Sequence, residues 1–186
     1  MKLLIMGPPG VGKGTQAKII KDKLRIAHIS TGELLRQEIA EKTEVGMVAK
    51  EYIDQGKLVP DNFLFTIVNE RLGKPDCRNG YILDGFPRTL NQANGLEKIM
   101  DSFNHSLDKA ISLYADEDAL VERLVKRGEN SGRSDDTSNI IRNRQKIYWQ
   151  QTAPLLDFYE ERGLLNNVNG LGEIKEITER ILTVIR

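Results

Sequence analysis

The sequence predicts an α/β fold in which a five-stranded parallel sheet carries helices on both faces. Apolar runs of four or five residues alternate with amphipathic stretches, the pattern of a parallel sheet covered by helices. The 186 residues, 39% hydrophobic and 29% charged, suffice for one domain with a buried core. A glycine-rich turn also joins the first apolar run to the first helical stretch.

This turn has the sequence GPPGVGKGT and runs from Gly7 to Thr15, directly after the apolar run 3–6. Its glycines let successive N–H groups point inward at the positive end of the helix, which favours an anion. Lys13 adds a charge that can reach the outer phosphates of a nucleoside triphosphate. A turn without a ligand is the alternative, but the flanking strand and helix favour a P-loop, although Gly14 separates Lys13 from Thr15.

Residues 30–59 interrupt the alternation, because they predict two short helices with no strand between them. Ser30 is expected to cap the first helix, with Glu33 completing a capping box. On this interpretation, the stretch has only a structural role as the N-terminus of a helix. However, the hydroxyl of Thr31 and the guanidinium of Arg36 lie about one and a half turns apart and can converge on one anion. We therefore expect a mobile inserted flap over residues 30–59.

The next strand, 81–83, ends in Asp84, which falls on the ligand edge of an open α/β sheet. A carboxylate there can hold hydrated magnesium beside phosphates, although it can also simply cap a turn. Arg88 is expected to face the same crevice, and the amide of Gln92 could read the edge of a base. Asp61, earlier in the chain, is expected to cap its own helix.

The helix expected over 116–127 carries Arg123 and Arg127 on one face, where like charges repel unless they share an anionic partner. A flexible polar loop, 128–136, is expected to follow it. Asp135 or Asp136 at the end of this loop is expected to cap the next helix.

That next helix is long and should kink or restart at Pro154. Trp149 within it is interpreted as a packing residue. A fifth strand is expected over 164–168 and a last helix over 174–185. His28, in the strand expected over 25–29, is interpreted as a structural core residue without a partner.

Several basic residues on separate loops are not explained by solvated helix faces. With Lys+Arg and Asp+Glu balanced at 27 each, no overall field attracts nucleic acid or a membrane, so such clustering is local. The set implies more phosphate than one nucleotide brings. No Ser-His-Asp or Cys-His arrangement is visible, and an anionic phosphate acceptor needs no general base. These residues are Lys13, Arg36, Arg88, Arg123, Arg127, Arg133 and Arg144.

Five motifs in chain order resemble those of nucleoside monophosphate kinases, and most closely those of adenylate kinases: GPPGVGKGT, STGELLR, GKLVP, DGFPRTLNQA and RLVKRGENSGRSDD. The resemblance implies a P-loop NTPase-type sheet with a small helical AMP-binding flap, 30–59, and a short lid, 128–136. The core is then 1–29, 60–127 and 137–186, in a single domain. The implied activity is reversible transfer of a phosphoryl group from Mg-ATP to AMP, which gives two ADP and maintains adenine nucleotide levels.

The resemblance also implies the role of each site residue. Asp84 orients magnesium through water. The catalytic residues are Lys13, Arg88, Arg127, Arg133 and Arg144. The ATP-binding residues are Gly10, Val11, Gly12, Lys13, Gly14, Thr15, Arg123 and Arg127. The AMP-binding residues are Thr31, Arg36, Lys57, Leu58, Val59, Gly85, Phe86, Pro87, Arg88, Gln92, Arg133 and Arg144.

Thr31 and Thr89 favour AMP as acceptor, because relatives that use UMP or CMP tend to have Ala and Asn at these places; a UMP/CMP kinase stays as the alternative. A non-kinase ATP-binding switch is a further alternative, without a basic stripe or aromatic platform to support it. The single cysteine, Cys77, excludes a four-cysteine zinc site and is typical of a reducing compartment. We expect no structural zinc, no nucleic acid or membrane partner, and a cytoplasmic monomer.

Overall fold

The computed structural model describes residues 1–131 and 133–186 and contains a five-stranded sheet in the order β2-β3-β1-β4-β5. Every neighbouring pair of strands is parallel. The expected α/β fold class is thus confirmed. The strands are β1 (Lys2–Met6), β2 (Ala27–Ser30), β3 (Tyr81–Asp84), β4 (Lys109–Tyr114) and β5 (Leu165–Asn169).

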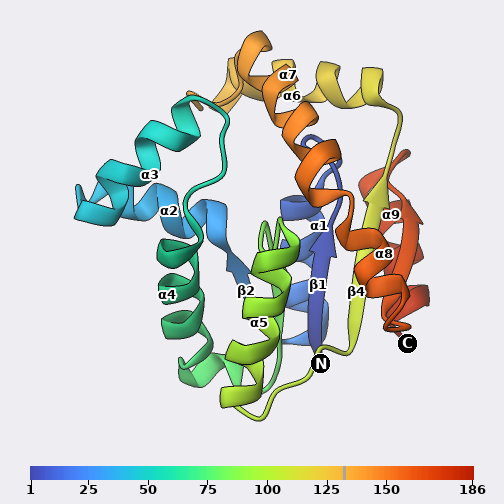
Figure 1. Ribbon diagram of the computed structural model, residues 1–186. Coiled ribbons are helices and arrows are strands. Elements are labelled where there is room, and N and C mark those ends of the chain that lie inside the picture. The colour runs from blue at the N-terminus through green and yellow to red at the C-terminus, as the bar shows by residue number, and fades with distance from the viewer. Residues whose placement is uncertain (132) are drawn as a thin grey trace.

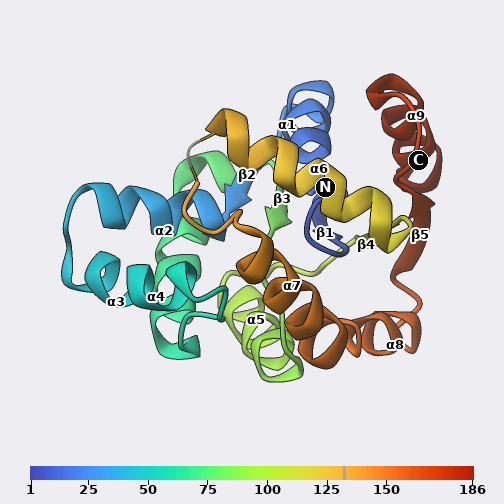
Figure 2. The same cartoon turned by 90° about the horizontal axis from the view of Figure 1, so that it is seen from above.

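Helices cover both faces of the sheet (Figures 1 and 2). Along β1, Leu4 and Met6 belong to one buried apolar cluster, whereas Leu3 and Ile5 belong to the other, as expected for a strand buried on both faces. The helices are α1 (Lys13–Leu24), α2 (Thr31–Ala40), α3 (Glu44–Asp54), α4 (Asp61–Leu72), α5 (Leu90–Ser102), α6 (Glu117–Ser131), α7 (Ser138–Ile147), α8 (Leu155–Glu160) and α9 (Ile174–Ile185), with a 3-10 turn η1 (Pro75–Cys77) and a π-turn η2 (Tyr148–Thr152).

The predicted flap consists of α2 and α3, which project to one side of the sheet, while α6 and α7 lie across the carboxyl ends of the strands (Figure 1). Ser30 caps α2 as expected, because its Oγ accepts from the N–H of Glu33 at 3.4 Å. The expected capping box is not formed, since the Glu33 carboxylate pairs with the ammonium of Lys18 at 2.7 Å instead.

Helix α6 extends four residues beyond Arg127, so the loop expected over 128–136 is shorter than predicted. Gly128, predicted to be the first residue of that loop, lies inside the helix. A Cβ at Gly128 would lie 2.8 Å from the carbonyl oxygen of Asp136 and 3.1 Å from its Cβ. The glycine therefore permits the returning chain to approach the helix. Gly132, also part of the expected lid, lies outside the described residues.

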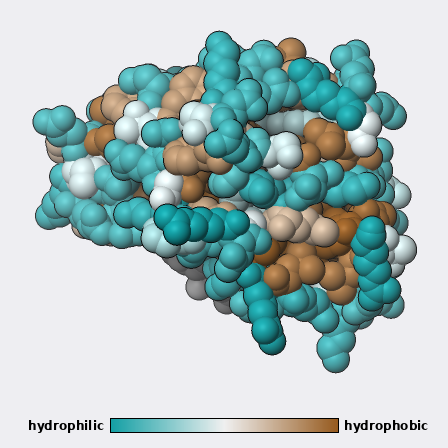
Figure 3. All heavy atoms as spheres, turned by 90° about the horizontal axis from the view of Figure 1, so that it is seen from below, coloured by the Kyte–Doolittle hydropathy of each residue, from teal (hydrophilic) through white to brown (hydrophobic). Residues whose placement is uncertain are grey.

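The helical run after the lid restarts at Pro154, as the sequence predicts. Helix α7 widens into the π-turn η2, and α8 begins at Leu155. The interpretation of Trp149 as a packing residue is wrong, because the residue is 55% exposed, although its ring lies edge-to-face with that of Tyr148 at 5.2 Å between centroids. Seen from below, the surface is mostly hydrophilic, with apolar residues gathered towards one side (Figure 3). None of the helices, over the residues described, is both long and apolar enough to cross a membrane.

Candidate active site

The glycine-rich turn has the backbone of an anion-binding loop. Gly12 begins α1 with φ of 101°, a conformation that side chains rarely adopt. At Gly7 a Cβ would collide with the carbonyl oxygen of Leu113. The Lys13 ammonium folds back and donates to the carbonyl oxygens of Gly7 at 2.7 Å and Pro8 at 3.0 Å. These two hydrogen bonds hold the Lys13 side chain against the glycine-rich turn.

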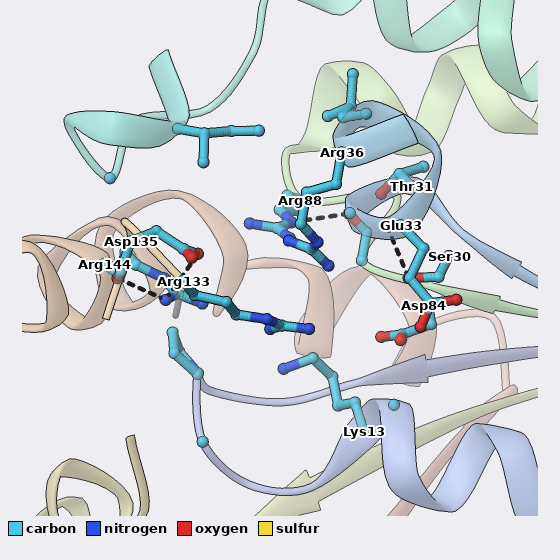
Figure 4. A pocket seen from close by; sticks show the side chains of 18 of the residues that line it. Lys13, Ser30, Thr31, Glu33, Arg36, Asp84, Arg88, Arg133, Asp135 and Arg144 are labelled. Carbon is cyan, nitrogen blue, oxygen red and sulfur yellow. Dashed lines mark hydrogen bonds and ion pairs between the residues drawn. The ribbon is translucent and has the colours of Figure 1, made fainter. Parts of the chain in front are cut away.

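A cleft of about 400 Å³ lies above this turn and between the flap and the lid. All seven basic residues singled out from the sequence line it, although they come from six separate segments. Figure 4 shows five of them: Lys13, Arg36, Arg88, Arg133 and Arg144. Among the described residues, nine basic and three acidic side chains line the cleft. Such an excess of positive charge in one cavity suits a polyanionic ligand.

Most of the predicted site residues line this cleft. They are Gly10, Gly12, Lys13, Gly14, Thr15, Thr31, Arg36, Lys57, Leu58, Val59, Asp84, Gly85, Arg88, Arg123, Arg127, Arg133 and Arg144. Four others lie outside its lining: Val11, Phe86 and Gln92, which are almost fully buried, and Pro87. The amide of Gln92 binds within the protein, where it donates to Asp61 and accepts from the backbone of Arg88. Its predicted contact with a base stays a prediction.

Four cations converge on the middle of the cleft without acidic partners. Within the described part of the chain, Lys13, Arg36, Arg88 and Arg133 have no carboxylate within ion-pair distance. Burial, and then the charge of Arg144, lowers the pKa of the Arg88 guanidinium. Burial, and then the charge of Arg133, does the same to Arg36. Negative charge brought by a ligand would relieve this repulsion.

A large shift falls on Lys13, whose pKa is lowered to about 7. Burial contributes most, the attraction of Asp84 opposes it, and the charges of Arg88, Arg144 and Arg127 lower it further. An opposite charge beside an ammonium raises its pKa. Phosphates bound at this position should therefore return Lys13 to its charged form.

This shift predicts that ATP binding takes up a proton. At pH 8 most Lys13 side chains are neutral, whereas phosphate oxygens, with a second pKa of about 6, are already ionised. Titration calorimetry in two buffers of different ionisation enthalpy should find roughly one proton taken up per ATP at pH 8, falling towards zero below pH 6, where Lys13 is already charged. Lys13→Arg stays charged throughout, so an equal uptake in that variant would contradict the assignment to Lys13.

Asp84 ends β3 beside the turn, with its carboxylate almost buried. A Cβ on Gly14 would lie 3.4 Å from Oδ2 of Asp84, so the carboxylate lies against the glycine that replaces the usual hydroxyl residue. Burial alone would raise the pKa of Asp84, but the neighbouring His28 and the charge of Lys13 outweigh it and hold the pKa below its ordinary value. An ionised oxygen donor at this place fits a hydrated magnesium ion.

His28 lies beside a carboxylate that the sequence did not reveal. Its Nε2 lies 3.6 Å from Oδ2 of Asp84, and the ring is nearly buried. The two residues lie on adjacent parallel strands, where Ser30 is in register with Asp84. Sequence reasoning missed the pair because β2 and β3 are separated by two flap helices and α4.

Asp135 and Asp136 do not cap α7, contrary to the expectation. Helix α7 begins after Thr137, and both carboxylates bind arginines. Asp136 accepts two hydrogen bonds from Arg127, both at 2.7 Å, and one from Arg144 at 2.7 Å. Asp135 pairs with Arg144 at 3.0 Å. The aspartates thus hold two of the predicted catalytic arginines, one from each helix beside the lid.

The lid and the flap also contact each other across the cleft. Ser134 Oγ donates to Asp54 Oδ1 at 2.7 Å, and the Asn143 amide donates to the carbonyl oxygen of Gln55 at 2.8 Å. Asp61 was expected to cap α4, but its side chain makes no capping hydrogen bond. It instead accepts hydrogen bonds from the side-chain amides of Asn91 and Gln92 of α5. The contact of Asn143 with Gln55 therefore connects the end of the flap to the core.

An open parallel sheet, a glycine-rich anion loop and a cleft lined by nine cations define a P-loop phosphotransferase whose substrates carry phosphate on both sides of the transfer. A family model for adenylate kinase matches residues 5–164. An adenylate kinase of Bifidobacterium longum is 49% identical over 98% of both chains, and one of Stenotrophomonas maltophilia is 47% identical over the full length of both. One of Leptospira biflexa is 48% identical over 99% of both. The chain belongs to the adenylate kinase family, enzymes that transfer a phosphoryl group from ATP to AMP.

Proposed function

We propose that ATP and AMP bind at opposite ends of the charged cleft and that the γ-phosphoryl group moves between them in its middle. The ATP phosphates lie over the turn from Gly10 to Thr15, and Arg123 lies beside the adenine of ATP. AMP lies between the flap and the loop 85–88. The observation that carries this proposal is the convergence of Lys13, Arg88, Arg133 and Arg144 from separate segments on one cavity.

The protein's part in the chemistry is positioning and charge stabilisation. The acceptor is a phosphate oxygen and already anionic, so no general base is needed. Lys13 and the backbone N–H groups of the turn hold the ATP phosphates. Arg88 holds the AMP phosphate, while Arg127, Arg133 and Arg144 stabilise the group in transfer. Magnesium, oriented through water by Asp84, supplies further positive charge at the phosphates when it is bound.

Closure of the flap, 30–59, and the lid, 128–136, excludes water from the transfer. Without closure the γ-phosphoryl group could be lost to hydrolysis, and the lid arginines would not reach it. The contact of Ser134 with Asp54 supports this, because it joins the two segments directly, and the contact of Asn143 with Gln55 joins the flap to the helix after the lid.

AMP is the proposed acceptor in preference to UMP or CMP. Thr31 lines the AMP end of the cleft and is almost fully buried, so its hydroxyl is placed where an unmet hydrogen bond would be costly. A Cβ on Gly85 would lie 3.0 Å from Oγ1 of Thr31, which keeps this space free for a ligand. The enzyme works as a cytoplasmic monomer, a proposal supported by its single buried cysteine and by a cleft formed within one chain.

The acceptor is tested by offering Mg-ATP with AMP, UMP, CMP or GMP separately, each beside an ATP-only control. We expect ADP at two per ATP consumed with AMP, and little product otherwise. A preference for UMP or CMP would overturn the acceptor while leaving the phosphate site in place. ATP binding without transfer to any monophosphate would point to a non-kinase ATP-binding switch.

A further inference from the structure

The main chain of Arg88 is held on both sides by side chains from two different helical segments. Oε1 of Gln92, in α5, accepts from the N–H of Arg88 at 2.7 Å. Oγ1 of Thr152, in the π-turn η2, donates to the carbonyl oxygen of Arg88 at 2.8 Å. The guanidinium then bends back, and its Nε donates to the carbonyl oxygen of Gly85 at 2.7 Å. Arg88 is thus fixed at its N–H, its C=O and its side chain.

The π-turn determines where Thr152 points. Eight residues at about 100° each would place Thr152 about 80° around a regular helix from Arg144. A π-turn inserts one extra residue and so removes about 100° of that phase difference, which returns Thr152 to nearly the face of Arg144. The wide turn is closed by a bond from the N–H of Ala153 to the carbonyl oxygen of Tyr148 at 2.8 Å, directly before Pro154.

The residues on that face surround a small cavity behind the phosphate site. The cavity measures about 60 Å³, and α7 and η2 contribute Arg144, Ile147, Tyr148 and Thr152 to its walls. Lys13, Gly85 and Arg88 line it from the other side. Thr152 is almost buried, so its hydroxyl contacts Arg88 from inside the protein. The continuous helical run of α7 and η2 therefore carries both Arg144, on the lid side of the cleft, and Thr152, which supports Arg88 on the acceptor side.

We propose that Thr152 is a positioning residue for the acceptor phosphate. Its hydroxyl and the amide of Gln92 fix the backbone of Arg88, so that the guanidinium is presented at one place in the cleft. The π-turn before Pro154 exists to deliver that hydroxyl. This inference rests on the proposed role of Arg88 in holding the phosphate of AMP.

A merely structural Thr152 would change stability without changing one substrate in particular. Thr178 in α9 provides the matched control, because it is also buried and its hydroxyl lies at 2.8 Å, within hydrogen-bond distance, from both Oε1 of Gln16 and the carbonyl oxygen of Ile174. Thr178→Val therefore removes a buried hydroxyl away from the cleft lining. Thr152→Val removes the bond to Arg88, and Thr152→Ser retains it.

Steady-state kinetics with each nucleotide varied, together with thermal unfolding, tests the proposal. We expect Thr152→Val to lower kcat/KM for AMP about tenfold, the factor of one neutral hydrogen bond, and to change KM for ATP less than about twofold. Thr152→Ser should recover AMP kinetics to within about threefold. Thr178→Val should lower the melting temperature as Thr152→Val does, with unchanged KM for both nucleotides.

A double-mutant cycle with Arg88→Ala decides whether Thr152 acts through Arg88. If it does, Thr152→Val adds nothing in the Arg88→Ala background. Additive losses, or a Thr152→Ser variant as impaired as Thr152→Val, would overturn the proposal. Should Thr152→Val fold poorly, Thr152→Ala removes the same hydroxyl and is measured in its place. If Arg88→Ala alone left AMP kinetics unchanged, the proposed role of Arg88 would fail first, which separates the two inferences.

Discussion

Replacing Arg88 with alanine should lower the rate of phosphoryl transfer about a thousandfold while leaving the protein folded. Arg88 lines the middle of the cleft and has no carboxylate partner among the described residues. Its loss removes a positive charge that repels Arg144, so the fold loses little, whereas the bound phosphates lose a donor with fixed geometry. Rapid-quench measurement of a single turnover, with circular dichroism to monitor folding, checks both parts.

Two further variants make the test of Arg88 specific. Arg88→Lys keeps the charge but not the planar fork, so its rate should fall between those of the wild type and the alanine variant. Arg78→Ala removes an exposed arginine next to the 3-10 turn η1, and it should change neither rate nor folding. A nearly active Arg88→Ala enzyme would remove Arg88 from the set of catalytic residues.

The members of the cationic site could be read from the sequence, but their partners could not. Lys13 is placed by the motif around it, and the arginines stood out because solvated helix faces did not account for them. All seven line one cleft. Asp135 and Asp136 precede a helix and carry the usual signal of a cap, so local reasoning assigned them to the wrong role. Their arginines lie eight or nine residues away along the chain, and only the folded lid brings the charges together.

The roles of individual glycines were also only partly predictable from the sequence. Gly12 was interpreted correctly, because a strand before it and a helix after it define its surroundings. Gly128 was predicted to begin a flexible loop, whereas it lies inside α6 and its missing side chain lets the backbone of Asp136 approach the helix. Both positions require glycine, but for different reasons: Gly12 adopts a positive φ, and Gly128 lies against the backbone of another segment. The sequence alone does not show which of the two reasons applies at a given glycine. Thr152 was likewise missed, since its position depends on a π-turn.

Asp136→Ala should reduce both activity and stability, in contrast to the replacement of an exposed carboxylate. The side chain of Asp136 is fully buried and receives three hydrogen bonds from Arg127 and Arg144. Its removal leaves the Arg127 guanidinium without its carboxylate partner and Arg144 paired with Asp135 alone, which costs about 3 kcal/mol in the free energy of unfolding. The transfer rate should fall roughly a hundredfold, because both arginines lose their position.

The ion pairs of Asp136 should also make the free energy of unfolding depend on pH. Burial would raise the pKa of Asp136, but Arg127 and Arg144 outweigh it and hold the pKa below its ordinary value. The carboxylate therefore stabilises the wild type fully above pH about 4, and this contribution is lost as the pH falls towards the lowered pKa. Denaturant unfolding from pH 7 to pH 3 should show this loss in the wild type, and the Asp136→Ala variant should lack it.

Asp76 offers the matched control for Asp136, because it forms a bidentate pair with Arg71 at 2.7 and 2.9 Å on the exposed surface. Asp76→Ala should cost less than about 1 kcal/mol and leave the transfer rate unchanged, since exposed pairs contribute little. Asp136→Asn keeps the shape of the side chain without its charge and should behave more like alanine than like aspartate. Equal costs for Asp76→Ala and Asp136→Ala would mean that Asp136 does not hold the lid arginines, whose position would then have to come from Asp135 and the bound phosphates.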